Sequence, residues 1–253
     1  MRIFLTQEGQ HAIFKVGGNS LLYQFILCPI LFSFLYQLCH IDSLSFKYFK
    51  SRSRCDYCNK VLDFYCLIPI ISYILLRGKS RCCKHRLSLT YIIGELLSLS
   101  PCILLTSSHL PITLTTYLLN FIFLLVLSIC DYDNYAIPLH VVVIYIICAI
   151  FLCEGHFINF LIISIILHCL FFIFKKAIGY GDILIFSLLS FILPFQVFFL
   201  TLQLTFIIAG MLTLILMMLQ RRKIYKVPLI PYILLGFITA NLVPSFFKIS
   251  SIF

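Results

Sequence analysis

The chain has 253 residues, of which 62% are hydrophobic and only 11% are charged, with a formal net charge of +10 and a mean hydropathy of +1.07. Soluble domains typically have about 25% charged residues, so this composition excludes an ordinary soluble domain and predicts an integral membrane protein. The positive charge does not indicate nucleic-acid binding, because Lys and Arg lie between apolar runs, as the positive-inside rule produces.

The chain begins with a polar stretch. Glu8, Gln10 and His11 make the first residues too polar for the apolar region of a signal peptide. We therefore interpret residues 1–19 as an N-terminal extension. The apolar runs that follow predict an all-α polytopic membrane protein with eight transmembrane helices and a short C-terminal tail, 248–253. The predicted spans lie at 20–40, 89–107, 113–130, 137–153, 157–174, 182–200, 203–220 and 229–247.

A polar loop, residues 41–88, separates the first two predicted spans and carries most of the positive charge. Ten of the 19 Lys and Arg residues lie in it, and six more lie in the loops 175–181 and 221–228. Eight spans put these loops on one side, which the positive-inside rule identifies as cytoplasmic, and both termini outside. Within the polar loop, the apolar run Tyr65–Leu76 is too short to span the bilayer and predicts a re-entrant or interfacial segment.

Acidic residues are rare, and three of the nine lie at predicted cytoplasmic helix ends. Asp131 and Asp133 end the third span, and Asp182 follows a glycine-rich string at the start of the sixth. Two neighbouring carboxyl groups share one proton, so one acts as a base toward water while the other polarises a peptide carbonyl. We therefore predict that Asp131 and Asp182 are a catalytic pair. Taken alone, the glycine-rich string would more often be a loop followed by an Asp helix cap.

Cysteines in the polar loop suggest a metal site. Cys55 and Cys58 form a C-x-x-C pair, and Cys82 and Cys83 follow after the apolar run. Two such groups suit tetrahedral zinc, with these four thiols as candidate ligands. The alternative is a set of free thiols. Most of the other cysteines lie in or beside apolar runs, where cysteine behaves as a small hydrophobic residue.

The aspartate segments resemble a known family. Residues 131–138 (DYDNYAIP) and 179–182 (GYGD) are similar to the first and second aspartate motifs of type IV prepilin peptidases. The resemblance implies that Asp131 and Asp182 are catalytic, and that Asp133, Gly179 and Gly181 support them. Two positions depart from the family pattern without replacing a catalytic group. These are Leu139, where members often have Asp, and Leu184, where they often have Lys.

The polar loop resembles the N-terminal cytoplasmic domain of the same family. The similar segments are 53–58, 67–73, 77–79 and 94–95. That domain usually carries two C-x-x-C pairs. Aligned on residues 77–79, the third cysteine position is Ser80, so Cys82 or His85 would have to supply the missing ligand. The resemblance also implies a second activity, in which the new N-terminus of the pilin is methylated from S-adenosylmethionine.

Two further residues have competing interpretations. Glu95 matches an acidic family position, or is an interfacial residue in a first helical turn, where a negative charge suits the helix dipole. His140 lies near Asp131 in sequence and is a candidate neighbour of the catalytic pair.

The expected reaction is removal of the short leader from type IV prepilins or competence pseudopilins at the cytoplasmic face of a bacterial membrane. The alternatives are an ion-coupled transporter or channel that uses the intramembrane aspartates, and a non-catalytic scaffold for pilus assembly. A preflagellin peptidase fits less well, because members of that group typically lack the cysteine loop.

Overall fold

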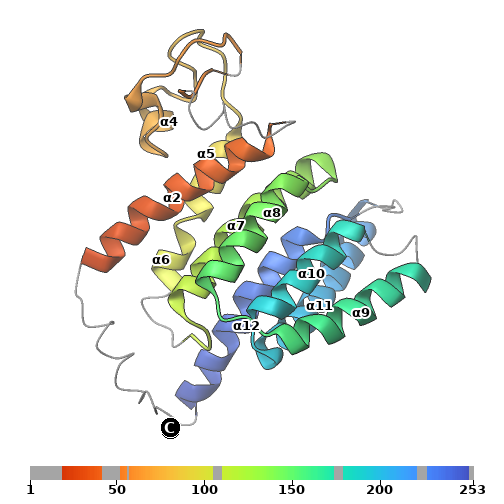
Figure 1. The fold of residues 1–253 in the computed structure, drawn as a ribbon. Helices are drawn as coiled ribbons and strands as arrows, with labels where there is room; N and C mark the ends of the chain where they lie inside the picture. The colour runs from red at the N-terminus through yellow and green to blue at the C-terminus, as the bar shows by residue number, and fades with distance from the viewer. Residues whose placement is uncertain are drawn as a thin grey trace.

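The computed structural model describes residues 19–41, 52–55, 57–104, 110–173, 179–220 and 227–250 (Figure 1). Within these ranges every regular element is a helix, and β-type pairing is confined to two isolated bridges, Arg54–Val61 and Lys79–Arg86. The all-α prediction is thus confirmed. Several predicted features lie outside the described ranges, among them most of the N-terminal extension, residues 42–51 of the polar loop, the end of the C-terminal tail, Lys175, Lys176 and the basic residues of 221–226.

Among the described residues, two helices are long and apolar enough to cross a membrane, α7 (Leu114–Asn134) and most of α11 (Phe195–Gln220). The other predicted spans coincide with apolar helices, several of which are shorter. These are α2 (Asn19–Cys39), α5 (Leu89–Leu97), α6 (Ser100–Leu104), α8 (Leu139–Leu152), α9 (Phe157–Ile173), α10 (Tyr180–Ile192) and α12 (Ile230–Ser250). The eight-span topology remains a prediction.

Prolines explain two differences from the predicted boundaries. The second predicted span is two helices, because Pro101 has no N–H to donate to the carbonyl of Leu97. The expected break between spans six and seven, near residue 201, is wrong. Leu193 precedes Pro194 and adopts an extended conformation, with φ −96° and ψ 144°, so α10 ends at Ile192. Helix α11 therefore begins eight residues earlier than predicted.

Helix α7 forms the centre of the core. It is buried along most of its length and packs against α2 and α12. Tyr117 of α7 stacks on Phe237 of α12 with ring centroids 5.3 Å apart. A buried hydrogen bond joins the Tyr145 hydroxyl of α8 to Asn120 of α7. These contacts place the C-terminal end of α7, which carries Asp131, next to the beginning of α12.

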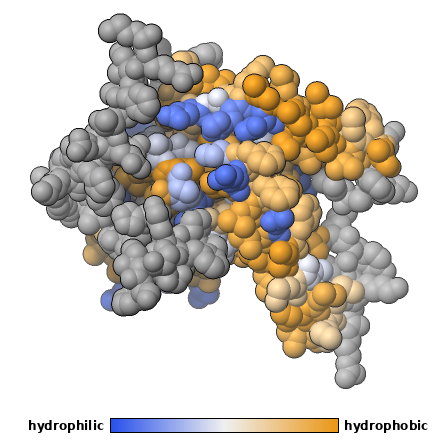
Figure 2. All heavy atoms as spheres, turned by 90° about the horizontal axis from the view of Figure 1, so that it is seen from below, coloured by the Kyte–Doolittle hydropathy of each residue, from blue (hydrophilic) through white to orange (hydrophobic). Residues whose placement is uncertain are grey.

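The outer helices expose apolar side chains, which is the pattern of a protein surrounded by lipid rather than water. None of the α9 residues is buried, and α11 exposes a long apolar face. Figure 2 shows apolar side chains over much of the visible surface, with hydrophilic side chains gathered in a limited area. The exposed positions on α9 and α11 include Phe157, Ile158, Ile162, Ile165, Met211, Leu214 and Met218.

Helices α11 and α12 approach each other closely at a glycine. A Cβ atom on Gly236 would lie 2.5 Å from Thr205 Oγ1 and 2.9 Å from the Thr201 carbonyl oxygen. Both threonine hydroxyls are buried and donate to carbonyls one turn earlier in α11. Small and hydroxyl-bearing residues therefore let the two backbones pack tightly.

Candidate functional site

Asp131 lies in the last turn of α7 and points at the beginning of α12. The side chain is buried, with 8% of its surface exposed. Its Oδ2 accepts a hydrogen bond of 3.2 Å from the backbone N–H of Ile230, the first residue of α12. An unpaired N–H at a helix start and the positive end of the helix dipole both favour a negative charge there. Helix α7 ends at Asn134, and its C-cap residue Tyr135 has a left-handed conformation.

Asp182 lies in the first turn of α10, and a Cβ at either of two nearby glycines would press on a neighbouring side chain. A Cβ on Gly179, the residue that caps α10, would lie 2.9 Å from Asp182 Oδ2. A Cβ on Gly181 would lie only 2.3 Å from Ile137 Cδ1. Ile137 belongs to the segment that follows Asp131 and Asp133. The two aspartate segments, separated by some 45 residues of sequence, are therefore in contact.

The structure brings the two predicted catalytic carboxyl groups near each other. The negative charge of Asp131 acts on Asp182. Asp133 is exposed and its charge acts on Tyr36 of α2 instead. Asp131 and Asp182 are therefore close enough to interact, whereas exposed Asp133 acts on α2.

His140 and Glu95 have other partners. The His140 Nε2–H donates to the carbonyl oxygen of Leu38 at 2.7 Å, which ties the start of α8 to the end of α2. Glu95 is buried in α5 and accepts a hydrogen bond of 2.6 Å from the backbone N–H of Ile70. The first turn of α5 contains no acidic residue, so the interpretation of Glu95 as a first-turn residue is wrong.

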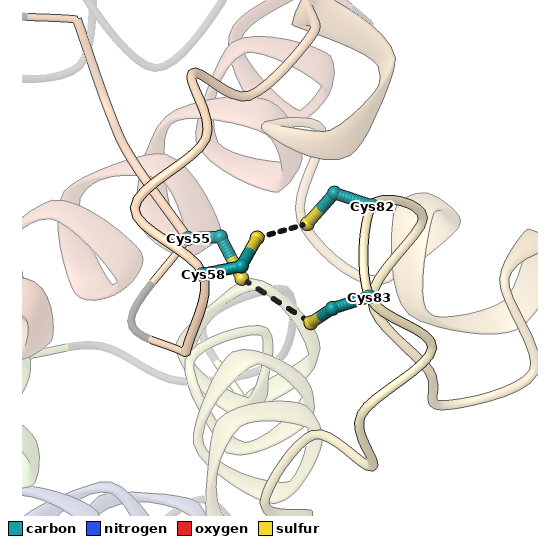
Figure 3. A group of neighbouring side chains, drawn as sticks. All are labelled: Cys55, Cys58, Cys82 and Cys83. Carbon is teal, nitrogen blue, oxygen red and sulfur yellow. Dashed lines mark hydrogen bonds between the residues drawn. The ribbon is translucent and has the colours of Figure 1, made fainter.

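Four thiols gather in the polar loop (Figure 3). The sulfur atoms of Cys55, Cys58, Cys82 and Cys83 all lie within 4.8 Å of one another. The Cys55 and Cys83 sulfurs are 3.8 Å apart, and the Cys58 and Cys82 sulfurs are 3.2 Å apart. Zinc–sulfur bonds of about 2.3 Å in a tetrahedron put sulfurs about 3.8 Å apart. The donor set and its spacing therefore fit a zinc ion.

The thiols come from two tight turns with the same backbone pattern. In the first turn Cys55 N–H donates to the Lys60 carbonyl and Asn59 N–H donates to the Cys55 carbonyl. In the second turn Ser80 N–H donates to the His85 carbonyl and Lys84 N–H donates to the Ser80 carbonyl. Ser80 therefore occupies the place that Cys55 has in the first turn, as the alignment predicted.

Cys82, rather than His85, compensates for the serine. The Cys82 sulfur reaches the other three, whereas the His85 ring packs against Tyr57, with centroids 3.6 Å apart. Ser80 stays buried and its hydroxyl lies 2.9 Å from the Cys83 sulfur. The second turn thus has the same backbone pattern as the first, but its first thiol lies at position 82 instead of position 80.

The thiols differ in acidity. Burial raises the pKa of Cys55, but hydrogen bonds from the backbone N–H groups of Cys58 and Tyr57 and from neighbouring thiols outweigh it and lower the pKa to about 7. Contacts with the sulfurs of Cys58 and Cys55 raise the pKa of Cys82 to about 12. Cys55 is therefore the first thiolate in the cluster, and thiolates are the form that binds metal.

Comparison with known proteins identifies the family. The profile described as the bacterial peptidase A24 N-terminal domain matches residues 26–109, and the profile of the type IV leader peptidase family matches residues 118–214. The chain belongs to the type IV leader peptidase family. The first match covers the cysteine turns and Glu95, and the second covers both aspartate segments.

Three curated relatives carry the name prepilin leader peptidase/N-methyltransferase. The chain is 44% identical over 46 residues to the protein of Vibrio cholerae, covering 18% of each chain. It is 39% identical over 75 residues to that of Bacillus subtilis, covering 29% of this chain and 30% of the relative. It is 31% identical over 87 residues to that of Pectobacterium carotovorum, covering 34% and 31%. The alignments thus span less than a third of each relative, and no solved structure matches the chain.

One part of the site was missed by the sequence analysis. The backbone N–H of Ile230 holds Asp131, although Ile230 has no reactive side chain. Pro228 and Pro231 provided a usable signal, because proline is common around helix starts. Together with the predicted topology, these prolines would have indicated that the last helix begins on the same side of the membrane as the aspartates.

Proposed function

We propose that this leader peptidase family member is an aspartic endopeptidase of the bacterial cell membrane. It removes the short leader from type IV prepilins or competence pseudopilins at the cytoplasmic face, with Asp131 and Asp182 as catalytic residues. The observation that carries the proposal is the contact between the two aspartate segments, in which Gly181 packs against Ile137 while the two carboxyl groups interact. The protease unit is residues 89–247, and residues 41–88 form a cytoplasmic cysteine domain.

The surroundings of the two carboxyl groups suggest different roles. Backbone N–H groups of Ile230 and Leu229 bind Asp131, whereas only that of Gly179 binds Asp182. The ionised form is therefore favoured at Asp131, which is the base that takes a proton from water. Asp182 keeps the shared proton and donates a hydrogen bond to the scissile carbonyl oxygen. The water oxygen bonds to the carbonyl carbon, the C–N bond breaks, and the leaving amine takes the proton from Asp131.

A structural zinc ion in the cysteine domain is part of the proposal. Cys55, Cys58, Cys82 and Cys83 would bind it as thiolates and hold the two turns together. The ion supplies no chemistry to peptide cleavage in this scheme, because the thiols are located in a separate domain from the aspartates.

N-methylation of the cleaved pilin is proposed as a second activity. The names of the three relatives couple the peptidase to an N-methyltransferase. The methyl group of S-adenosylmethionine would pass to the new N-terminal amine of the pilin, and the amine would lose a proton. A test is transfer of radiolabelled methyl from S-adenosylmethionine to a pilin that has already been cut.

The peptidase proposal is tested by a cleavage assay in membranes. A prepilin is co-expressed with the unmodified protein, Asp131→Asn or Asp182→Asn, and the loss of the leader is followed by the change in size. Each substitution removes one of the two carboxyl groups, so cleavage should fall by at least about 1,000-fold while the amount of protein in the membrane stays the same. Asp63→Asn is the matched control, because Asp63 makes an exposed ion pair with Arg81 outside the site.

The same assay separates the alternatives. Cleavage by both Asn variants would reject the catalytic pair. A prepilin that binds the unmodified protein but is never cut would favour the scaffold. Ion uptake that depends on both aspartates, without any cleavage, would favour the transporter or channel.

A further inference from the structure

An unusual apolar surface lies on the cysteine domain. The segment 64–75 contains a short 3-10 helix, η1 (Phe64–Cys66), and one turn and a half of α-helix, α4 (Ile71–Leu75). Neither element buries a residue. Large apolar side chains are exposed throughout the segment, namely Phe64, Tyr65, Leu67, Ile68, Ile71, Ile74 and Leu75. Single exposed apolar residues are usually scattered over a protein surface. A contiguous apolar surface of this kind therefore indicates contact with lipid or with another molecule.

The position of Ile70 shows how deep the segment lies. Its backbone N–H donates to Glu95, which is seven residues beyond Ser88, the N-cap of α5. At 1.5 Å per residue, Glu95 lies about 10 Å from the start of α5. The same carboxylate bonds to the Ser33 hydroxyl, six residues or about 9 Å before the end of α2. In the predicted topology the end of α2 and the start of α5 face the cytoplasm, which puts Ile70 below both helix ends at the depth of the bilayer. In Figure 1, α4 accordingly lies beside α2 and outside the bundle.

The backbone of the segment is largely satisfied by local hydrogen bonds, as a chain in contact with hydrocarbon requires. The N–H groups of Cys66, Leu67 and Ser72 donate to the carbonyls of Asp63, Phe64 and Ile68, and Gly78 N–H donates to the Tyr73 carbonyl. Pro69 has no N–H to satisfy. The chain reverses at Ile70.

The reversal of the chain at Ile70 is held in place by Glu95. Its φ of +62° is unfavourable for a β-branched residue. Local backbone bonds leave its N–H without a carbonyl partner, and Glu95 accepts it. A buried carboxylate that holds a strained turn is an anchor for the whole segment.

The charges around the segment suit a lipid surface. Residues 64–76 carry no charge, whereas Arg77, Lys79 and Arg81 follow immediately. The one acidic residue at its border, Asp63, is paired with Arg81 at 3.1 Å. An apolar segment with tyrosine and a basic border is the pattern that places side chains in the acyl region and cations at anionic headgroups.

We propose that residues 64–75 are a re-entrant membrane anchor that seats the cysteine domain on the cytoplasmic leaflet. The apolar side chains of α4 enter the acyl region, the basic border contacts anionic lipid headgroups, and Glu95 holds the turn at depth. This anchor rests on the membrane location and orientation of the proposed function but not on peptide cleavage, so it stands even if the protein cuts no prepilin.

The chain contains no tryptophan, so single-tryptophan variants report on one position each. Ile71→Trp and Leu75→Trp place the reporter on α4, and Lys60→Trp places it on the exposed first cysteine turn. Each full-length protein is reconstituted in vesicles of phosphatidylcholine and phosphatidylglycerol with bromine atoms on the acyl chains. Bromine quenches tryptophan on contact, and acrylamide quenches it from water. The expected result is strong bromine quenching and weak acrylamide quenching at positions 71 and 75, with the reverse at position 60.

Two outcomes would overturn the proposal. Acrylamide quenching at positions 71 and 75 that equals the quenching at position 60 would put α4 in water. Protection of both positions from bromine and acrylamide would mean that protein covers α4, either a prepilin or a second copy of the chain. The amount of zinc bound per chain should match in all variants, which shows that the cysteine domain is folded.

A second pair of variants tests the role of Glu95. Glu95→Gln keeps an oxygen acceptor for the Ile70 N–H, whereas Glu95→Ala removes it. Bromine quenching at position 71 should therefore persist with Gln and fall at least twofold with Ala. Equal quenching in the two variants would show that the carboxylate does not hold the turn.

Discussion

The contact between Gly181 and Ile137 leads to a quantitative prediction about catalysis. In Gly181→Ala the added Cβ would lie 2.3 Å from Ile137 Cδ1 and 3.2 Å from Cγ1. Carbon atoms pack at about 3.5–4.0 Å. Cδ1 is the end of the Ile137 side chain and can turn aside, but Cγ1 cannot, so the two aspartate segments would have to separate by a few tenths of an ångström. Because Asp182 is the next residue in the chain, its carboxyl group would move with the backbone. A displacement of about 1 Å in a catalytic constellation costs about 100-fold in rate, so a shift of a few tenths of an ångström should slow prepilin cleavage by Gly181→Ala roughly three- to tenfold.

Removing the obstructing atoms should restore activity. Alanine at position 137 retains only Cβ, which lies 3.7 Å from the added methyl group, an ordinary contact. The double variant Gly181→Ala with Ile137→Ala should therefore cut prepilin roughly threefold faster than Gly181→Ala alone, or more. Initial rates of leader removal in membranes, normalised to the amount of protein, give both ratios.

A matched control separates this contact from a general effect of alanine. Gly210 lies in α11, and a Cβ there would meet nothing within 4 Å, so Gly210→Ala should cleave like the unmodified protein. Full activity of Gly181→Ala, or a double variant no faster than the single one, would refute the idea that this contact sets the distance between the aspartates.

Three further predictions concern the cysteine domain and the helix packing. Cys82→Ser should weaken zinc binding by about 100-fold in a chelator competition, since each of four thiolates contributes about a quarter of the 10–16 kcal/mol typical of a structural zinc site. Adding Ser80→Cys should recover the affinity. Undiminished zinc binding by Cys82→Ser would exclude Cys82 as a ligand. In the metal-free protein, alkylation of Cys55, measured by mass spectrometry of the labelled peptide, should become half-maximal near pH 7. Its pKa lies at about 7 instead of 9.0, and the reactive thiolate is lost as the pH falls through that value. A midpoint near pH 9 would contradict the hydrogen bonds that lower the pKa. Gly236→Ala should lower the free energy of unfolding by about 1–3 kcal/mol in a detergent titration, because the new Cβ meets the backbone of α11, which cannot rotate away. A change no larger than that of Gly210→Ala would show that α11 and α12 can accommodate the added methyl group.

Much of the arrangement could be predicted because membrane topology is a strong constraint. The positions of Asp131 and Asp182 at two helix ends, together with the distribution of basic loops, already implied that both carboxyl groups face one side. Local rules were also sufficient where they were applied in full. Pro194 indicates the break between α10 and α11, but the apolar run continues across it, so hydropathy alone placed the break eight residues too late.

Contacts between distant parts of the chain could not be predicted from such patterns. Nothing in the residue types indicates that Glu95 accepts the N–H of Ile70, since the partner is a backbone group in a turn of unusual conformation. The fourth thiol shows the same limit. An alignment identifies Ser80 as the altered position, but only the geometry of the two turns shows that Cys82 reaches the other sulfurs and that His85 does not.

The hydrogen bond from Ile230 links catalysis to the packing of the last two helices. Asp131 accepts a hydrogen bond from a backbone N–H, so most side chains at position 230 would preserve it. What matters is the position of the residue 230 N–H relative to Asp131. That place is set by α12, whose position in turn depends on the close approach of Gly236 to Thr201 and Thr205. A change at Gly236 that left the protein folded would thus move the N–H away from Asp131 and weaken the preference of Asp131 for the ionised form. The base of the proposed reaction therefore depends on a contact between α11 and α12 that includes no catalytic residue.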